Sequence, residues 1–245
     1  ALQHQEFHLY YQVQVSNENR AIGAEALLRW QHPDRGLIAP EQFLPLAEET
    51  GLFLPIGWWI LRTACAQIKV WSGDPATRDL QLAVHVSARQ FRQPDFVMQV
   101  RQALSGSGAD PTRLKIELTE SLVIDNLSDT IAKILELKTL GVNFAMNDFG
   151  TGSSLLTYLK QLPLAQLKID QSFVSDLATD RKNATIVRAI VILGRTFGLN
   201  VIAEGVETDT QKELLDLLGC HTFQGCLFSR PVPIAEFENL LLQYS

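Results

Sequence analysis

Polar side chains that can do chemistry stand at or near the ends of apolar stretches in this sequence. One stretch, VNFAMNDFGTG at 142–152, is an apolar run that ends in Asn147 and Asp148 and then turns through two glycines. The carboxyl end of a buried strand is where α/β barrels and open α/β sheets place reactive groups. Alternatively, Asn147 and Asp148 only start a turn, since Asn, Asp and Gly are common turn residues.

The same pattern of strand, polar tip and helix recurs along the chain, which favours the chemical interpretation. The other polar residues at strand ends are Glu25, His85, Glu117, Lys168, Glu204 and Gln224. In a barrel these ends meet at one mouth, where gathered carboxylates repel one another unless protons or divalent cations neutralise them. Oxygen-rich ligand sets suit Mg²⁺ or Mn²⁺, so the pattern predicts metal-assisted hydrolysis of a phosphate ester.

The elements that would position these residues begin with a hairpin. The ranges 7–15 and 21–30 read as two strands joined by turn residues, so the chain starts antiparallel. Two helices are predicted next, at 40–51 and 56–71. A strand at 80–87 then leads through Pro94 into a helix that ends near Gly106.

Strands and helices alternate regularly in the rest of the chain. The predicted strands are 114–118, 142–146, 166–169, 199–203 and 221–223, and the predicted helices are 128–140, 153–162, 182–198, 211–218 and 233–242. Eight strands with intervening helices predict an α/β fold of the (β/α)8 barrel type, with an opening hairpin that departs from the all-parallel scheme. An open doubly wound sheet is the alternative, but the Gly-rich dinucleotide-binding turn is missing.

Length and composition limit the possible architectures. A chain of 245 residues with 46% hydrophobic residues can bury one large core, and no Pro/Gly/Ser-rich linker divides it. We therefore predict one domain over 1–245. The apolar stretches are too short to span a bilayer and no signal peptide precedes the first strand. Because the sequence begins with Ala rather than Met, we expect it to be part of a longer protein. We also expect a cytoplasmic domain, in a full-length protein that could be membrane-attached.

The charge and the cysteines exclude further classes. A net charge of -6 argues against a nucleic-acid polymer as partner, whereas a small phosphorylated ligand could still be met by local cations. The three cysteines, Cys65, Cys220 and Cys226, are odd in number and lack Cys-x-x-Cys spacing. This argues against a disulfide framework or a structural zinc site and predicts reduced, part-buried thiols.

Several short motifs give the chain a family resemblance. Residues 25–29 read EALLR, which resembles the signature of the EAL domains, bacterial phosphodiesterases or receptors for the second messenger cyclic di-GMP. Further matches are ELTE at 117–120, DFGTG at 148–152, KID at 168–170, AEGVET at 203–208 and QG at 224–225. The resemblance covers nearly the whole chain. It implies a modified TIM (β/α)8 barrel with one antiparallel strand, in agreement with the opening hairpin.

The resemblance also implies a role for each polar residue. The metal-ligand positions are Glu25, His85, Glu117, Asn147, Asp148 and Glu204. The expected catalytic residues are Lys168, Glu204 and Asp148, with Lys168 orienting a water molecule. The expected ligand-binding residues are Gln12, Arg29, Gln224 and Glu207, and Glu120 is expected to anchor the loop at 149–154. Alternatively, Arg29 pairs with Glu48 or Glu49 on the surface, and Gln12 is a polar group of the barrel rim.

Two of the metal-ligand positions depart from the family pattern. The family has Asn where this chain has His85, and it has Asp, the residue that bridges two metal ions, where this chain has Asn147. A unit charge pair at about 4 Å is worth roughly 4 kcal/mol at an effective dielectric of about 20, so a neutral amide weakens ion binding. Imidazole is also a poor partner for Mg²⁺. We expect at most one well-bound Mg²⁺ or Mn²⁺.

The departures favour a receptor for cyclic di-GMP or a strongly impaired phosphodiesterase. The alternative is an active metal-dependent phosphodiesterase that hydrolyses cyclic di-GMP to linear pGpG, because Glu25, Lys168 and Glu204 are intact. A third possibility is an interaction module that no longer binds nucleotide. The resemblance further implies a homodimer, and upstream sensory or GGDEF-type domains in the full-length protein.

Overall fold

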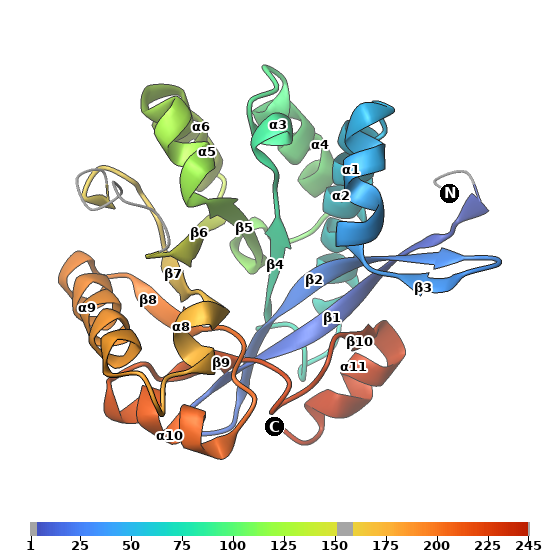
Figure 1. Cartoon of the computed structure of the whole chain (residues 1–245). Coiled ribbons are helices and arrows are strands. Elements are labelled where there is room, and N and C mark those ends of the chain that lie inside the picture. The colour runs from blue at the N-terminus through green and yellow to red at the C-terminus, as the bar shows by residue number, and fades with distance from the viewer. Residues whose placement is uncertain (1–3, 151–158, 245) are drawn as a thin grey trace.

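The computed structural model describes residues 4–150 and 159–244. These residues form a barrel of strands with helices around its outside (Figure 1). The strands are β1 (Phe7–Ser16), β2 (Ala21–His32), β3 (Gly36–Ile38), β4 (Gln81–His85), β5 (Leu114–Thr119), β6 (Asn143–Phe149), β7 (Gln166–Ile169), β8 (Asn200–Ala203), β9 (Thr222–Gln224) and β10 (Val232–Pro233). The helices are α1 (Pro40–Glu49), α2 (Phe53–Trp71), α3 (Ala88–Phe91), α4 (Phe96–Ser107), the 3-10 turn Pro111–Arg113, α5 (Glu120–Asp125), α6 (Leu127–Lys138), α8 (Gln171–Ser175), α9 (Arg181–Phe197), α10 (Asp209–Leu217) and α11 (Ile234–Leu241).

The strand pairing confirms the predicted barrel. The described strands follow the order β10-β1-β9-β8-β7-β6-β5-β4-β2-β3, and an additional pairing of β1 with β2 closes the ring. Strand β1 is antiparallel to both β2 and β9, whereas the pairs from β2–β4 round to β8–β9 are parallel. The open doubly wound sheet is therefore wrong. The carboxyl ends of the parallel strands meet at one mouth, together with the amino-terminal part of β1.

Burial explains why the central segments are strands. All four residues of β7 are buried, as are the first five of β5, because the side chains that face away from the barrel axis pack against helices. Helix α9 has clear end signals: Asp180 caps it through the Lys182 N–H, and Gly198 ends it in the left-handed conformation. Short elements at the strand ends, such as α3, α5 and α8, were not predicted. The predicted helix at 153–162 lies mostly outside the described residues.

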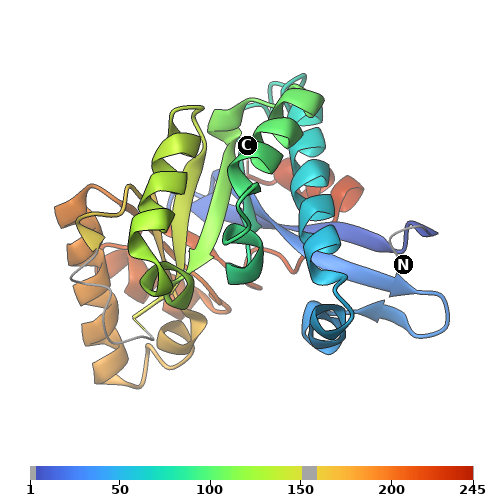
Figure 2. The same ribbon diagram turned by 90° about the horizontal axis from the view of Figure 1, so that it is seen from above.

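The opening hairpin carries a small core of its own. The ends of β1 and β2 project beyond the ring of helices, together with β3 (Figure 2). A cluster separate from the main core fills the space between them and the first two helices, and its buried members are Phe7, Leu28, Ile38, Phe43, Ala47 and Ile56. This cluster fixes α1 and α2 beside the mouth of the barrel.

The cysteines are free thiols, as predicted, although their burial differs from the expectation. Cys65 and Cys220 are fully buried, whereas Cys226 is exposed. Burial raises the pKa of both Cys65 and Cys220 to about 12, so these two thiols stay protonated. Within residues 4–150 and 159–244, no helix combines the length and apolar character that a membrane crossing needs.

Candidate functional site

Lys168 stands at the centre of the polar cluster at the mouth. Its Nζ lies 2.7 Å from Glu117 Oε2, 3.0 Å from Glu25 Oε2 and 2.5 Å from Glu204 Oε1. The Lys168 and Glu117 side chains are completely buried. Residues from strands β2, β5 and β7, and the residue directly after β8, therefore meet at one ammonium group. Lys168 is thus a buried residue of the barrel interior.

The ionisable groups around the Lys168 ammonium have pKa values that are shifted in different directions. Burial lowers the pKa of Lys168, but Glu117, Glu204 and Glu25 outweigh it and raise that pKa well above its ordinary value. Burial raises the pKa of Glu204 to about 7, with Lys168 opposing this shift and the other two glutamates adding to it. For Glu25, burial is outweighed by Lys168 and by hydrogen bonds, so its pKa is lowered. Near pH 7, Glu204 is thus the carboxyl group able to exchange a proton.

Asn147 uses its amide nitrogen as a bridge between two neighbours. Its Nδ2 lies 3.0 Å from Glu117 Oε2 and 3.4 Å from His85 Nδ1. A carboxylate can only accept hydrogen bonds, so the N–H₂ side of the amide must face Glu117. Within the described part of the chain, the buried Asn147 Oδ1 is left without a hydrogen-bond partner. Asn147, which the resemblance places where a bridging aspartate is expected, therefore donates toward Glu117.

A backbone irregularity brings two consecutive residues of β6 to the same mouth. The pairing of β6 with β7 shifts register between Met146 and Phe149, and Asp148 has a φ of 56°. Neighbouring residues of a regular strand face opposite sides, whereas a bulge can re-aim one of them. Burial and the nearby Asp170 raise the pKa of Asp148, and His85 and Lys168 act in the opposite direction. Asp148 thus belongs to the same charge cluster as Lys168.

A chain of glutamine side chains connects the cluster to β1. Gln224 Nε2 donates to Glu25 Oε2 at 2.6 Å and lies 3.0 Å from Gln12 Oε1. Gln14 Nε2 donates to Gln224 Oε1 at 2.9 Å, while Gln12 Nε2 donates to the Ser229 carbonyl oxygen at 2.9 Å. Gln12 is thus part of the network that holds Glu25. The ligand-binding role of Gln12 stays a prediction.

Arg29 lies on the projecting hairpin and contacts its own strand. Its Nη1 donates to the Leu28 carbonyl oxygen at 2.7 Å, and its guanidinium lies 5.8 Å from the centre of the Tyr10 ring. Burial lowers the pKa of Arg29, and the charges of Glu41, Tyr10 and Glu25 act against this. The acidic groups near Arg29 are thus Glu41 and Glu25 rather than the alternative partners Glu48 and Glu49. The guanidinium remains half-buried beside the mouth.

Two further expected site residues are Glu120 and Glu207. Glu120 begins α5 and is buried, and part of the loop that it is expected to anchor lies outside the described residues. Glu207 is exposed, and its backbone N–H donates to Gln211 Oε1 at the start of α10. Among the contacts of residues 4–150 and 159–244, none brings the Glu207 side chain to Lys168. Its ligand-binding role stays a prediction.

The donor set fits one oxygen-liganded divalent cation. Glu117 Oε1 and Asn147 Oδ1 are buried oxygens without a hydrogen-bond partner in the described part of the chain. Glu25, Glu117, Asp148 and Glu204 outnumber the single ammonium of Lys168, so the cluster has negative charge to offer. Such oxygen donors are what Mg²⁺ and Mn²⁺ prefer. No group of three His, Cys, Asp or Glu residues in the described ranges is already arranged around a cation position.

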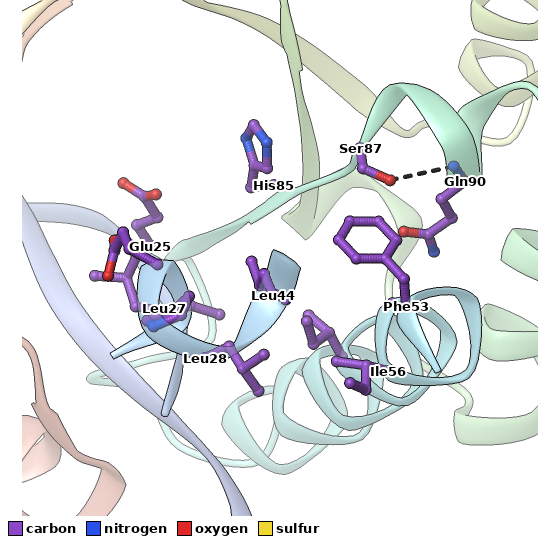
Figure 3. Close-up of a pocket in the computed structure, with 14 residues that line it drawn as sticks. Glu25, Leu27, Leu28, Leu44, Phe53, Ile56, His85, Ser87 and Gln90 are labelled. Atoms are coloured by element: carbon purple, nitrogen blue, oxygen red, sulfur yellow. Dashed lines mark hydrogen bonds between the residues drawn. The ribbon is translucent and has the colours of Figure 1, made fainter. Parts of the chain in front are cut away.

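An apolar recess opens beside the polar cluster. It has a volume of about 270 Å³ and lies between β2, α1, α2 and the turn that follows β4. Glu25 and His85 border it on the side of the cluster, and Phe53 and Gln90 lie at the opposite side (Figure 3). Leu27 and Leu44 contribute apolar walls. A flat heterocycle attached to a phosphate could therefore enter the recess while the phosphate stays at the mouth.

Three buried polar residues of the barrel interior were missed by the sequence analysis. Gln14 supports Gln224, and Lys115 Nζ donates to Gln166 Oε1 at 2.9 Å below the cluster. Burial lowers the pKa of Lys115 to about 8, with Glu117 opposing and Lys168 assisting this shift. The available signal was spacing, because Lys115 stands two residues before Glu117 and Gln166 stands two before Lys168. Residues two apart in a strand share a face.

Comparison with known proteins agrees with this geometry. The model of the EAL domain family matches residues 1–231. The sequence is 47% identical over 234 residues to the bifunctional diguanylate cyclase/cyclic di-GMP phosphodiesterase MucR of Pseudomonas aeruginosa, which covers 95% of this chain and 34% of that protein. The chain thus spans about a third of the length of the curated relatives it matches.

Solved structures with the same fold contain a nucleotide. The MucR phosphodiesterase in complex with c-di-GMP matches with a TM-score of 0.92 and 46% identity, over 97% of this chain and 96% of that one. The EAL domain of FimX from P. aeruginosa, bound to c-di-GMP, matches with a TM-score of 0.84 and 26% identity, over 95% and 93% of the two chains.

Proposed function

The chain belongs to the EAL domain family, and from its site we propose that it binds cyclic di-GMP, as a receptor or a strongly impaired phosphodiesterase. The observation that carries this proposal is the amide of Asn147. It donates to Glu117 at the position where the family has an aspartate that bridges two metal ions. A neutral donor at that position supports nucleotide binding more than two-metal hydrolysis.

The proposed ligand would be held at two places. Arg29, Gln12 and Gln224 would contact the phosphates and one guanine, since guanidinium and amide groups suit phosphate oxygens and base edges. The apolar recess beside Glu25 and His85 would take a base. Because His85 is exposed at the mouth, it could also face a phosphate.

At most one divalent cation is proposed in this cleft. Glu117, Asn147 and Asp148 would hold it, with Glu25, Glu204 and His85 as further ligands. Mg²⁺ or Mn²⁺ would offset negative charge on the phosphoryl oxygens when bound. Lys168 would then position a water molecule, and Glu204 would accept its proton.

An active phosphodiesterase that releases linear pGpG is the second candidate function. The observation that favours it is the intact arrangement of Lys168 with three glutamates, and of Gln224 with Glu25. The relative MucR is named as a phosphodiesterase, which adds to this candidate.

The setting of the domain is proposed from its relatives. MucR is about three times as long as the matched region and is named as bifunctional, so we propose that this domain also works beside upstream sensory or GGDEF-type domains. We further propose a cytoplasmic location, within a protein that a membrane anchor could hold, and a homodimer. Cross-linking and sedimentation of the full-length protein would test the dimer.

A paired measurement separates the two candidate functions. The domain is titrated with cyclic di-GMP by calorimetry, and the same samples are incubated with Mn²⁺ or Mg²⁺ and analysed for linear product. We expect binding in the micromolar range or tighter, with little or no product. Turnover at a rate typical of enzymes would favour the second candidate. No heat at hundred-micromolar nucleotide would exclude both and leave an interaction module.

A further inference from the structure

A second lysine lies inside the barrel below the carboxylates. Lys115 is 5% exposed and precedes Glu117 by two residues on β5, so both side chains point to the barrel interior. The neighbouring position on β4 is Ala83, whose small, buried side chain leaves room for the lysine stem. Buried lysines are rare unless they are paired, so this position calls for a physical explanation.

The ammonium of Lys115 has a neutral partner. Its Nζ donates to Gln166 Oε1 at 2.9 Å, and Gln166 is 3% exposed on β7, two residues before Lys168. A neutral amide satisfies one hydrogen bond but leaves the positive charge in place. That charge interacts favourably with Glu117 and unfavourably with Lys168. Lys115 and Gln166 therefore form a layer directly beneath the pair Glu117–Lys168.

The positive charge of Lys115 makes the net charge near the carboxylates less negative. Above it, the carboxylates of Glu25, Glu117 and Glu204 share the ammonium of Lys168. A cation that enters such a cluster gains from the carboxylates and is repelled by every buried positive charge nearby. The repulsion doubles for a divalent ion. Because the interior is shielded from water and salt, little of this interaction is screened.

We propose that Lys115 is an internal counter-charge that weakens divalent-cation binding at the cluster above it and lets the carboxylates remain together without a metal ion. It is a positioning residue, since it touches neither the proposed cation nor the nucleotide. The inference rests on the proposed cation site of the cleft and not on nucleotide binding.

The test compares cation affinity in matched variants. Lys115→Met removes the charge and keeps most of the side-chain volume, and Lys115→Gln provides a second uncharged variant if the first folds poorly. Lys133→Met is the control, because Lys133 is also buried but lies on α6 and donates to the Phe91 carbonyl oxygen outside the barrel. Mn²⁺ is titrated into each protein at pH 7 by calorimetry, without nucleotide. Thermal unfolding is followed in parallel with EDTA or with Mn²⁺.

The expected result is severalfold tighter Mn²⁺ binding, up to about tenfold at pH 7, for both Lys115 variants, because a lysine with a pKa of about 8 can release its proton when a cation enters. Both variants should also show a larger rise in melting temperature with Mn²⁺ than the parent shows. Lys133→Met should match the parent. Unchanged or weaker Mn²⁺ binding in folded Lys115 variants would overturn the proposal, and so would absence of binding in every protein at millimolar Mn²⁺. Cyclic di-GMP titrations of the same variants report separately on the proposed function.

Discussion

Lys168 and Glu117 form a completely buried ion pair, with Nζ 2.7 Å from Oε2, at the junction of all the polar contacts of the mouth. Glu117 also accepts from Asn147, while Lys168 also reaches Glu25 and Glu204. The buried ammonium of Lys168 offsets the negative charge that the glutamates bring into this site. A change to one member should therefore be felt both in stability and in ligand binding.

Removing the central ammonium should destabilise the domain. Lys168→Met leaves three gathered carboxylates without their counter-charge, and breaking a buried ion pair costs about 3–5 kcal/mol. Urea unfolding at pH 7 measures the loss. Lys138→Met, at an exposed lysine that donates to the Pro163 carbonyl oxygen, should change stability by less than about 0.5 kcal/mol. Equal stability of both variants would contradict the central role of Lys168.

Loss of the Arg29 guanidinium should weaken nucleotide binding. Arg29→Ala is expected to reduce the affinity for cyclic di-GMP by roughly 1.5–3 kcal/mol, the usual range for a charge-assisted hydrogen bond. Calorimetric titration gives this value. Arg20→Ala serves as the control, because Arg20 is 73% exposed and pairs with Glu18. An unchanged affinity for Arg29→Ala would remove Arg29 from the ligand-binding set.

Restoring the family's residues should restore hydrolysis. The double change His85→Asn with Asn147→Asp is expected to raise the rate of linear product formation by at least about a hundredfold, or about 2.7 kcal/mol of transition-state stabilisation. The remaining cluster already stands in place around Lys168. Asn147→Asp alone should recover most of the gain, since it turns a donor toward Glu117 into an anionic oxygen. If the parent already turns over rapidly and the double change has no effect, the receptor proposal is wrong.

The metal-free domain should lose stability as the pH rises from about 4.5 to about 7. Burial raises the pKa of Glu204 from 4.5 to about 7, so in this window the folded state holds a proton that the unfolded state releases. This stabilising contribution is complete below pH 4.5 and is lost as the pH rises through the pKa that Glu204 has in the folded state. A difference of one bound proton between the folded and unfolded states changes the free energy of unfolding by at most about 1.4 kcal/mol per pH unit.

Urea unfolding in EDTA across this pH range, for the parent and for Glu204→Gln, checks the expected slope. The variant cannot titrate at this position, so its slope should be smaller. Burial also raises the pKa of Asp148, so Asp148 contributes to the slope with the same sign. It accounts for the slope that remains in Glu204→Gln. A parent domain whose stability climbs steadily through this window would refute the assignment to Glu204.

The sequence predicted the barrel because its periodic patterns are strong. The hairpin at 7–15 and 21–30, and the strand 166–169 with its terminal Lys168, were placed within a few residues of the structure. Strand ends that carry polar groups then led directly to the cluster, because parallel strands end at one mouth. The barrel and its polar cluster could thus be predicted from local sequence patterns and from the rule that parallel strands of a barrel end at one mouth.

The support beneath the cluster could not be predicted in the same way. Lys115, Gln166 and Gln14 lie away from the strand ends that form the mouth, and their partners come from strands far away in the sequence. The apolar recess likewise depends on how α1 and α2 pack against β2. The turn of Asp148 into the left-handed region depends on the register shift between β6 and β7. Each of these features arises from tertiary packing rather than from local preference.

The placement of β1 between β2 and β9 has a consequence for how the domain folds. Contacts of Gln12 with Gln224 and Ser229 join residues 212 and 217 positions apart, so they can form only when the two ends of the sequence meet. Loop closure over such a distance is entropically costly and tends to come late. A nascent chain would have most of its parallel strands before it has a complete mouth. The network that holds Glu25 should therefore be complete only at a late step of folding.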